Sequence, residues 1–201
     1  MKILMVDVDG VLVHGRPRDG LAYFTDIERD LGISIKLLQR EFFHPHWAEI
    51  IIGHEPIEPR LTAVLKRIAP HLDTETLLRY WFENDSRLDQ TLLADLADLR
   101  AKGTRLYLAT NQEHRRANWL MKEHGLAQHF DGIFYSAALG CKKPSHDFYR
   151  LATEAVSLPR EEIFYIDDAA ENIESATAFG WNAAHWRQGM RLDEAFAAKS
   201  E

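Results

Sequence analysis

The chain has 201 residues, a formal net charge of −7 and one cysteine, Cys141. An acidic chain without a basic run disfavours nucleic acid and anionic membranes as main partners, because both attract clustered Lys and Arg. A single cysteine excludes an intramolecular disulfide and a cysteine-based zinc site. The N-terminal apolar run is too short for a signal peptide and no stretch approaches a membrane span, so we expect a cytoplasmic protein.

An apolar run opens the chain at Ile3–Val6 and leads directly into two acids, Asp7 and Asp9. Such a run is typical of a buried strand, where acids are tolerated only at the end and facing a ligand. The later strand-like runs are Arg105–Ala109, Ile133–Tyr135, Ile163–Ile166 and Ala183–Trp186, and the helix-like stretches between them are Arg115–His124, His146–Val156 and Glu171–Phe179. This alternation predicts the α/β class, with a parallel sheet covered by helices on both faces.

The first two strands are too far apart in the sequence for a simple β–α–β crossover, which needs roughly thirty residues. The excess contains no alternating strand pattern, but it contains amphipathic pieces at Leu21–Leu31, Ile35–Phe43, Arg60–Ile68 and Thr76–Phe82. Pro and Gly punctuate it, as expected for short helices joined by turns. We therefore predict a core domain of residues 1–15 and 89–201, with a small helical domain of residues 16–88 inserted after the first strand.

Polar residues follow several of the predicted strands at the point where each strand ends. They are Asp7 and Asp9, then Thr110 and Asn111, then Asp167 and Asp168, with Lys142 and Lys143 near the third strand. Ligands bind beyond the carboxyl ends of parallel strands, so we expect these side chains to lie at the ligand-binding site. Four carboxylates repel one another unless a cation is present. Oxygen ligands without cysteine favour Mg²⁺, which commonly binds beside a substrate phosphate, and the set is typical of phosphoryl transfer.

The order and strand context of these motifs resemble the haloacid dehalogenase-like hydrolase superfamily. The matching features are D-x-D-G at Asp7–Gly10, Thr110 followed by Asn111, Lys143 before Pro144, and the acidic pair Asp167–Asp168, together with Asn172 and Gly180. The resemblance implies a Rossmann-like three-layer α/β/α core. The helical insertion is similar to the small cap of the first subclass, and the pattern is closest to the sugar-phosphate phosphatases and the phosphatase domain of bifunctional epoxide hydrolases.

The resemblance also implies a role for each motif residue. Asp7 would be the nucleophile that forms an aspartyl-phosphate, and Asp9 the general acid and then base. Lys143 would offset negative charge, while Thr110 and, less firmly, Asn111 would hold phosphate oxygens. The magnesium ligands would be Asp7, Asp168 and the backbone carbonyl of Asp9, with Asp167 acting through water. Which of Asp167 and Asp168 binds the ion directly is left open.

The second acid narrows the expected reaction. Relatives that cleave carbon–halogen bonds lack an acid at the position of Asp9, because a halide leaving group needs no proton. We therefore expect Mg²⁺-dependent hydrolysis of a small phosphorylated metabolite, such as a sugar phosphate. The alternatives are phosphotransfer as in a mutase, 2-haloacid dehalogenation, and a catalytically idle member that only binds ligands. The oligomeric state is left open.

Within the insertion, the segment FFHPHWAEI offers candidate substrate contacts in His44, His46 and Trp47. For the two histidines the alternative is a solvated turn, and a role as metal ligands is disfavoured because no third ligand lies nearby. Two motif pairs have a structural alternative as helix N-caps, namely Thr110–Asn111 and Asp167–Asp168.

Overall fold

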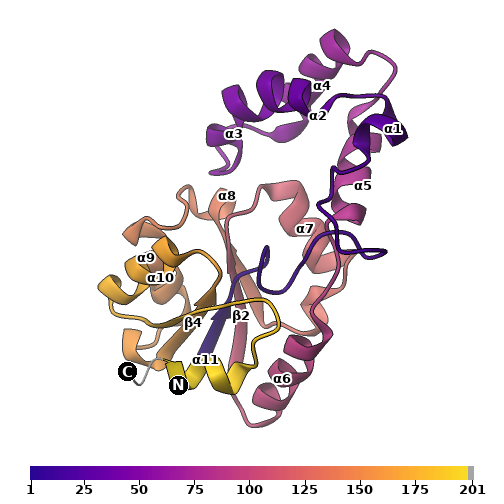
Figure 1. Cartoon of the computed structure of the whole chain (residues 1–201). Coiled ribbons are helices and arrows are strands. Elements are labelled where there is room, and N and C mark those ends of the chain that lie inside the picture. The colour runs from indigo at the N-terminus through magenta and orange to yellow at the C-terminus, as the bar shows by residue number, and fades with distance from the viewer. Residues whose placement is uncertain (199–201) are drawn as a thin grey trace.

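The computed structural model describes residues 1–198 and contains a five-stranded sheet in the order β3-β2-β1-β4-β5 (Figure 1). All neighbouring pairs are parallel. The strands are β1 (Ile3–Val6), β2 (Arg105–Thr110), β3 (Gly132–Tyr135), β4 (Ile163–Asp167) and β5 (Asn182–His185). They coincide closely with the predicted apolar runs, so the α/β class with a parallel sheet is confirmed.

β1 is the central strand and is buried along its whole length. It pairs with β2 on one side and β4 on the other, so that Val6 lies beside Leu108 and Ile166. Parallel strands finish at the same edge of a sheet, and that edge is where ligands bind in such folds. The residues that follow β1, β2 and β4 therefore meet at one place.

Helices cover both faces of the sheet. They are α6 (Gln90–Ala101), α7 (His114–Lys122), α8 (Ser136–Leu139), α9 (His146–Val156), α10 (Ala170–Phe179) and α11 (Leu192–Ala198), with short 3-10 helices η2 (Leu126–Gln128) and η3 (Arg160–Glu162). Successive side chains of a strand point to opposite faces. Val6 accordingly packs with residues of α6, α7 and α11, whereas Met5 packs with residues of α9 and α10. No helix within residues 1–198 has both the length and the apolar character needed to cross a membrane.

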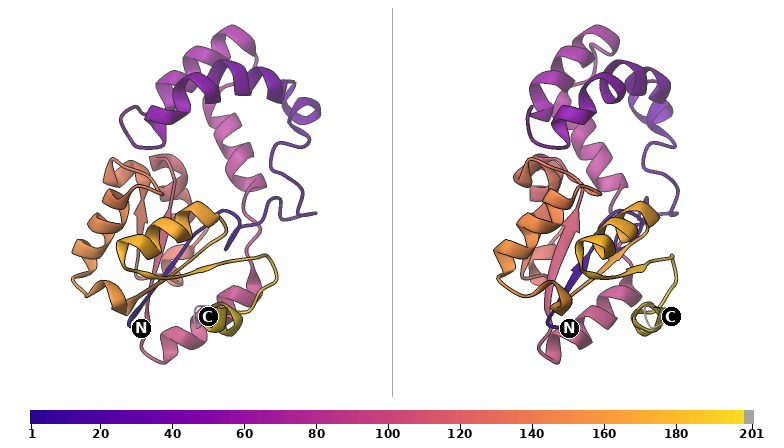
Figure 2. Two further views of the ribbon diagram at one scale, coloured as in Figure 1. Left: turned by 60° about the vertical axis from the view of Figure 1, so that its left-hand side comes forward. Right: turned by 90° about the vertical axis from the view of Figure 1, so that its left-hand side faces the viewer.

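The residues between β1 and α6 form helices with an apolar cluster of their own, in which Phe42, Leu61 and Trp81 are buried. The elements are α1 (Ile27–Leu31), α2 (Ile35–Leu38), the π-helix η1 (Gln39–Phe43), α3 (His44–Ile50), α4 (Ile57–Ile68) and α5 (Thr74–Asn84). Figures 1 and 2 show these helices gathered at one end of the molecule. We refer to residues 16–88 as the proposed cap. The end of the predicted core, residues 199–201, lies outside the described residues.

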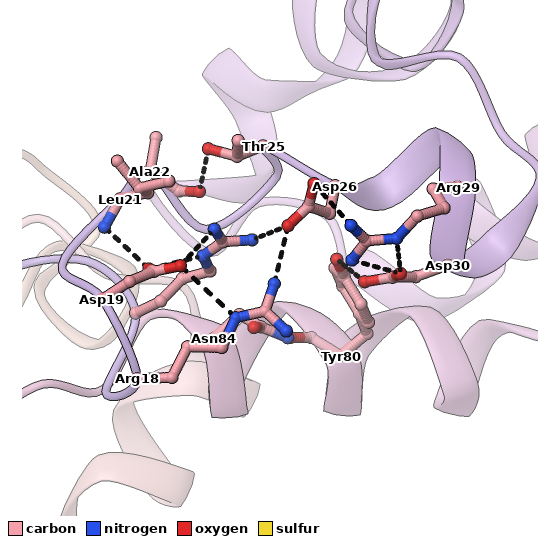
Figure 3. Close-up of polar contacts among 11 residues, drawn as sticks. Arg18, Asp19, Leu21, Ala22, Thr25, Asp26, Arg29, Asp30, Tyr80 and Asn84 are labelled. Carbon is pink, nitrogen blue, oxygen red and sulfur yellow. Dashed lines mark hydrogen bonds and ion pairs between the residues drawn. The ribbon is translucent and has the colours of Figure 1, made fainter.

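The predicted helix over Leu21–Leu31 is wrong in its first half, because only Ile27–Leu31 is helical. Turns precede it, and Figure 3 shows the arginine and aspartate side chains that hold this segment. Asp26 accepts hydrogen bonds from Arg16 Nη1 at 2.5 Å and from Arg18 Nη2 at 2.6 Å. These charge-assisted contacts hold the segment in a path that amphipathic spacing does not reveal.

The alternative of a solvated turn for His44 and His46 is also wrong, because both lie on α3. Pro45 does not interrupt the helix, although it is the second residue of α3. The turn before it, η1, is a π-helix, so the hydrogen-bond pattern is already shifted away from i→i−4 where the proline lacks its N–H. The chain is thus helical from η1 straight into α3, which the pattern of apolar residues did not predict.

Candidate active site

A sharp turn after β1 brings the first pair of acids to the edge of the sheet. The backbone N–H of Asp7 donates to the carbonyl of Ile166 at 3.0 Å, which continues the pairing with β4. Gly10 then adopts a φ of +82°, and a Cβ atom on it would lie 2.1 Å from Oδ2 of Asp168. Glycine therefore serves twice at this position, because it permits the turn and leaves room for the carboxylate of the neighbouring strand end.

Asp7 is buried at the centre of the site. Its Oδ1 accepts a hydrogen bond from the backbone N–H of Val8 at 2.8 Å and lies 2.9 Å from Nζ of Lys143. Burial raises the pKa of Asp7 to about 7, because the attraction of Lys143 offsets the loss of solvent only in part and Asp167 adds repulsion. Additional positive charge beside this carboxylate would favour its ionised form.

Lys143 is buried among oxygen atoms. Besides Asp7, its Nζ contacts Oδ2 of Asp167 at 2.6 Å, the hydroxyl of Tyr165 at 2.8 Å and the carbonyl of Ala109 at 2.9 Å. Burial alone would lower the pKa of Lys143, but the two acids outweigh it and raise the pKa above its usual value. Lys143 therefore remains a cation beside Asp7. Lys142, its competitor in the sequence, is exposed.

The two acids at the end of β4 differ in their surroundings. Asp167 is fully buried, and besides Lys143 it accepts hydrogen bonds from the Tyr165 hydroxyl, the Asn172 side chain at 2.9 Å and the Ala169 N–H at 2.7 Å. Burial would raise the pKa of Asp167, but Lys143 and these donors hold it below its usual value. Asp168 is exposed. The alternative of an α10 helix cap is wrong for both, because Ala169 holds the N-cap position.

Three carboxylates at this edge could hold a metal ion together. Asp7, Asp167 and Asp168 each offer an oxygen atom, and the three atoms lie within 4.8 Å of one another. An oxygen-only set with one exposed member fits a hard cation such as Mg²⁺, which keeps part of its water shell. Because Asp167 already accepts four hydrogen bonds, Asp168 is the better placed of the two for direct contact with an ion.

The end of β2 contributes Thr110 and Asn111. Thr110 is buried at the strand end, beside the site. The side chain of Asn111 bonds both backbone groups of Lys143: it accepts from the N–H at 2.9 Å and donates to the carbonyl at 3.1 Å. This pair of bonds fixes the segment that carries the lysine. The helix-cap alternative for Thr110–Asn111 is wrong, because Glu113 caps α7.

Asp9 is exposed, and two donors hold its carboxylate. Nε2 of Gln112 donates to its Oδ2 at 2.5 Å, and Nη2 of Arg116 donates to its Oδ1 at 3.1 Å. The same Nη2 lies 3.0 Å from Oδ2 of Asp85, at the end of α5. Gln112, Arg116 and Asp85 were not predicted as site residues. Only Gln112 had a signal in the sequence, since it directly follows Asn111.

A cavity of about 770 Å³ lies between the edge of the sheet and the proposed cap. Core residues on its wall include Asp9, Asn111 and Arg116. The opposite wall is largely aromatic and aliphatic, with Tyr23, Trp47, Ile51 and Trp81. Of the predicted substrate contacts in the insertion, the structure brings Trp47 to the cavity, whereas His44 and His46 do not line it.

Comparison with known proteins agrees with this geometry. The family model for haloacid dehalogenase-like hydrolases matches residues 1–180. A phosphoglycolate phosphatase from Cereibacter sphaeroides is 25% identical over 94% of this chain and 86% of its own. A sesquiterpene phosphatase, astK, from Aspergillus oryzae is 31% identical, but this match spans only 49% of the chain and 50% of the relative.

Solved structures show the same fold over nearly the whole chain. The HAD family enzyme bt-2542 from Bacteroides thetaiotaomicron, in complex with magnesium and inorganic phosphate, superposes with a TM-score of 0.80 at 17% identity and covers 98% of this chain and 99% of its own. The resemblance seen in the four motifs is thus confirmed. The chain belongs to the haloacid dehalogenase-like hydrolases.

Proposed function

We propose that this chain is a Mg²⁺-dependent phosphatase that hydrolyses a small phosphomonoester through an aspartyl-phosphate on Asp7. The observation that carries the proposal is the second acid. Asp9 lies at the cavity, two positions after the buried Asp7, and two donors orient its carboxylate. A leaving alkoxide needs a proton and a leaving halide does not, so an oriented acid here favours phosphate esters over haloacids.

In the first step, a carboxylate oxygen of Asp7 attacks phosphorus and the bond from phosphorus to the leaving oxygen breaks. Asp9 donates its proton to that oxygen. In the second step Asp9 takes a proton from water as the water attacks phosphorus, and the bond to Asp7 breaks to release inorganic phosphate. Lys143 stabilises negative charge beside Asp7 throughout, from a distance of 2.9 Å.

The metal ligands of the proposal are Asp7, Asp168 and the backbone carbonyl of Asp9, with Asp167 acting through water. Bound Mg²⁺ supplies the positive charge that lets the carboxylates and a phosphate share the site. The oxygen atoms offered by the three aspartate side chains, within 4.8 Å of one another, support this assignment.

For the substrate we propose a sugar phosphate or a metabolite of similar size. Thr110 would hold a phosphate oxygen, and Asn111 would act chiefly by fixing Lys143, whose backbone it bonds twice. The leaving group would occupy the cavity of about 770 Å³ and contact Trp47. We do not assign His44 and His46 to this site, because neither lines the cavity. The relatives named as phosphatases support the reaction class, and a cytoplasmic location stays a prediction.

Turnover of 4-nitrophenyl phosphate with and without Mg²⁺ tests the proposal. We expect Mg²⁺-dependent release of phosphate that Asp7→Asn abolishes and Asp9→Asn strongly reduces. Asp98→Asn, at an exposed acid of α6, is the control for loss of a negative charge and should leave the rate unchanged. No turnover by the wild type, or full turnover by Asp7→Asn, would overturn the phosphatase assignment. Halide release from a 2-haloacid in place of phosphate release would favour the dehalogenase.

A further inference from the structure

We propose that Arg116, together with Gln112, is a positioning residue that aims the carboxylate of Asp9 for proton transfer and links it to the base of the proposed cap. The inference rests on the phosphatase function proposed above. It concerns a residue that the motifs of the sequence do not single out. It makes the orientation of the general acid depend on two side chains from the start of α7 and the segment before it.

Asp9 needs external support more than Asp7 does. The side chain of Asp9 is 51% exposed, whereas Asp7 is buried and bonded to its own neighbour's N–H. An exposed carboxylate exchanges between rotamers unless neighbouring groups hold it, and a general acid must keep its geometry in the transition state. Gln112 bonds one oxygen of Asp9 and Arg116 bonds the other, so the two donors together define the plane of the carboxylate.

Both donors are anchored in the core. The carbonyl of Gln112 accepts hydrogen bonds from the N–H of Ala137 and the hydroxyl of Ser136, each at 3.2 Å. Arg116 lies in the first turn of α7, where Glu113 caps its backbone N–H. The positions of the two donors are therefore set by α7 and α8, which makes them a rigid support for a flexible acid.

Stability alone does not explain a charged side chain at this position. Arg116 is 2% exposed, and its guanidinium lies 5.9 Å from the centre of the Phe82 ring. A buried ion pair is commonly no more stabilising than an apolar side chain of similar volume, because both charges lose their hydration. A buried arginine that spans two acids is better explained by what it does for Asp9.

Asp85, the other acid bound by Arg116, connects this arrangement to the proposed cap. Nη2 of Arg116 also bonds the backbone carbonyl of Asp85 at 2.8 Å, and Asp85 ends α5. The chain then returns to the core, where the N–H groups of Ser86 and Arg87 donate to the carbonyl of Gly15. Arg116 therefore contacts the proposed cap where its last helix joins the core. The position of α5 therefore determines whether Asp85 can hold the guanidinium of Arg116 next to Asp9.

The neighbouring arginine provides a matched control. Arg115 also reaches the proposed cap, where it pairs with Glu58 at 2.7 Å and Glu75 at 2.8 Å. Within the described part of the chain, its side chain forms hydrogen bonds with these two acids and not with Asp9. Each of the two substitutions thus removes one arginine of α7 that bonds the proposed cap. Only the substitution of Arg116 also removes a hydrogen bond to the general acid.

The test compares phenyl phosphate with 4-nitrophenyl phosphate, two esters of similar shape whose leaving groups differ in their need for a proton. We expect Arg116→Met to lower kcat/KM for phenyl phosphate at least about tenfold more than kcat/KM for 4-nitrophenyl phosphate, because general acid catalysis contributes about 10² to 10⁴. The ratio kcat/KM is compared because it reports the first step, in which the leaving group departs, whereas the second step is the same for both esters. Arg116→Lys, which keeps the charge but not the fork of donors, should show a smaller loss of the same kind.

Two control variants and a check of folding decide the result. Arg115→Met should change both esters by the same factor, and Arg116→Met in an Asp9→Asn background should add no further selectivity. If Arg116→Met does not fold by circular dichroism, Arg116→Lys carries the comparison. An equal loss of kcat/KM for both esters in the Arg116 variants, with the wild type active, would overturn the inference while the phosphatase function stands. An inactive wild type would instead overturn the proposed function itself.

Discussion

The strongest constraint at the scale of single residues is the close approach of two strand ends at Gly10. Its backbone φ is +82°, and the position that a Cβ atom would take is already filled by the Asp168 carboxylate. Side chains are excluded for two separate reasons, backbone strain and collision. Asp168 is a proposed metal ligand, so we expect the glycine at this position to matter for ion binding as well as for folding.

A substitution at Gly10 separates the effect on ion binding from the effect on folding. We expect Gly10→Ala to raise the Mg²⁺ concentration needed for half-maximal activity at least about tenfold, because displacing a ligand or its support typically costs that much affinity. Gly103→Ala is the control, since Gly103 also has a positive φ, +92°, but its Cβ would meet nothing within 4 Å. It should lower Tm without changing the Mg²⁺ dependence. Equal Mg²⁺ dependence in the two variants would contradict the argument.

When no metal is bound, the ionisation of Asp7 should lower the stability of the folded chain as the pH rises. Its pKa is raised to about 7 in the folded chain, chiefly by burial. An acid whose pKa is higher in the folded state binds more protons when folded, so its contribution to stability falls as pH rises between the two pKa values and is constant above them. In EDTA, the wild type should therefore lose unfolding free energy relative to Asp7→Asn from about pH 4 to about pH 7.

Denaturant titrations of both proteins at several pH values measure this difference. Added Mg²⁺ should reduce it, because the ion binds the ionised wild-type site and stabilises the folded state by mass action. The variant lacks one of the proposed ligands and should gain less. A difference between the two proteins that does not vary with pH in EDTA would show that Asp7 is ionised throughout.

Much of the site could be predicted at this scale, and the reason is local. Asp7 directly follows β1, and Thr110 and Asp167 are the last residues of β2 and β4, so the strand pattern itself indicates where they lie. Arg116 could not be found in this way. It meets Asp9 across 107 residues of sequence. A contact between a loop residue and the start of a distant helix leaves no periodic signal in the sequence.

At the scale of elements, the strands were predictable and the helices of the proposed cap were predictable only in part. Each strand coincides with a short run that contains apolar residues, and the sequence locates its ends to within one residue. In the cap, charged side chains decide the path instead. The segment before α1 has helical spacing, but ion pairs to Arg16 and Arg18 hold Asp26 in place outside the helix.

Two arginines of this network differ in burial and should differ in their contribution to stability. Arg16 is 1% exposed and bonds both Asp19 and Asp26, whereas the side chain of Arg18 is 54% exposed. We expect Arg16→Met to lower Tm clearly more than Arg18→Met, because exposed ion pairs contribute little and the buried guanidinium also fills space. Thermal unfolding by circular dichroism measures both. Equal shifts in Tm would mean that the network acts only through its total charge.

At the scale of the whole molecule, the proposed cap meets the core through contacts on both sides of the cavity. On one side Arg116 bonds Asp85 near the linkers. On the other side, the hydroxyl of Ser136 donates to the carbonyl of Ile51 at 2.6 Å, in the turn after α3. The cavity is therefore bounded by contacts at two separate places, and the contact at the turn after α3 includes none of the proposed catalytic residues.

Gly53 offers a means to loosen that contact. It lies in this turn with a φ of +75°, and a Cβ atom there would come within 2.3 Å of the carbonyl of Ala137 in α8. That carbonyl belongs to the core backbone and cannot move aside, so Gly53→Ala should push the turn away from α8. Gly140→Ala supplies the control, because Gly140 has a similar φ of +69° with no atom within 4 Å of its Cβ.

The proposed division of labour predicts which constant changes. If the core binds phosphate and the cap wall binds the leaving group, Gly53→Ala should raise KM for a phosphomonoester several-fold while the inhibition constant for inorganic phosphate stays within about twofold of the wild type. Gly140→Ala should leave both unchanged. A parallel rise in both constants for Gly53→Ala would mean that the turn after α3 supports the phosphate site as well. The separation of the leaving-group wall from the phosphate site would then be wrong.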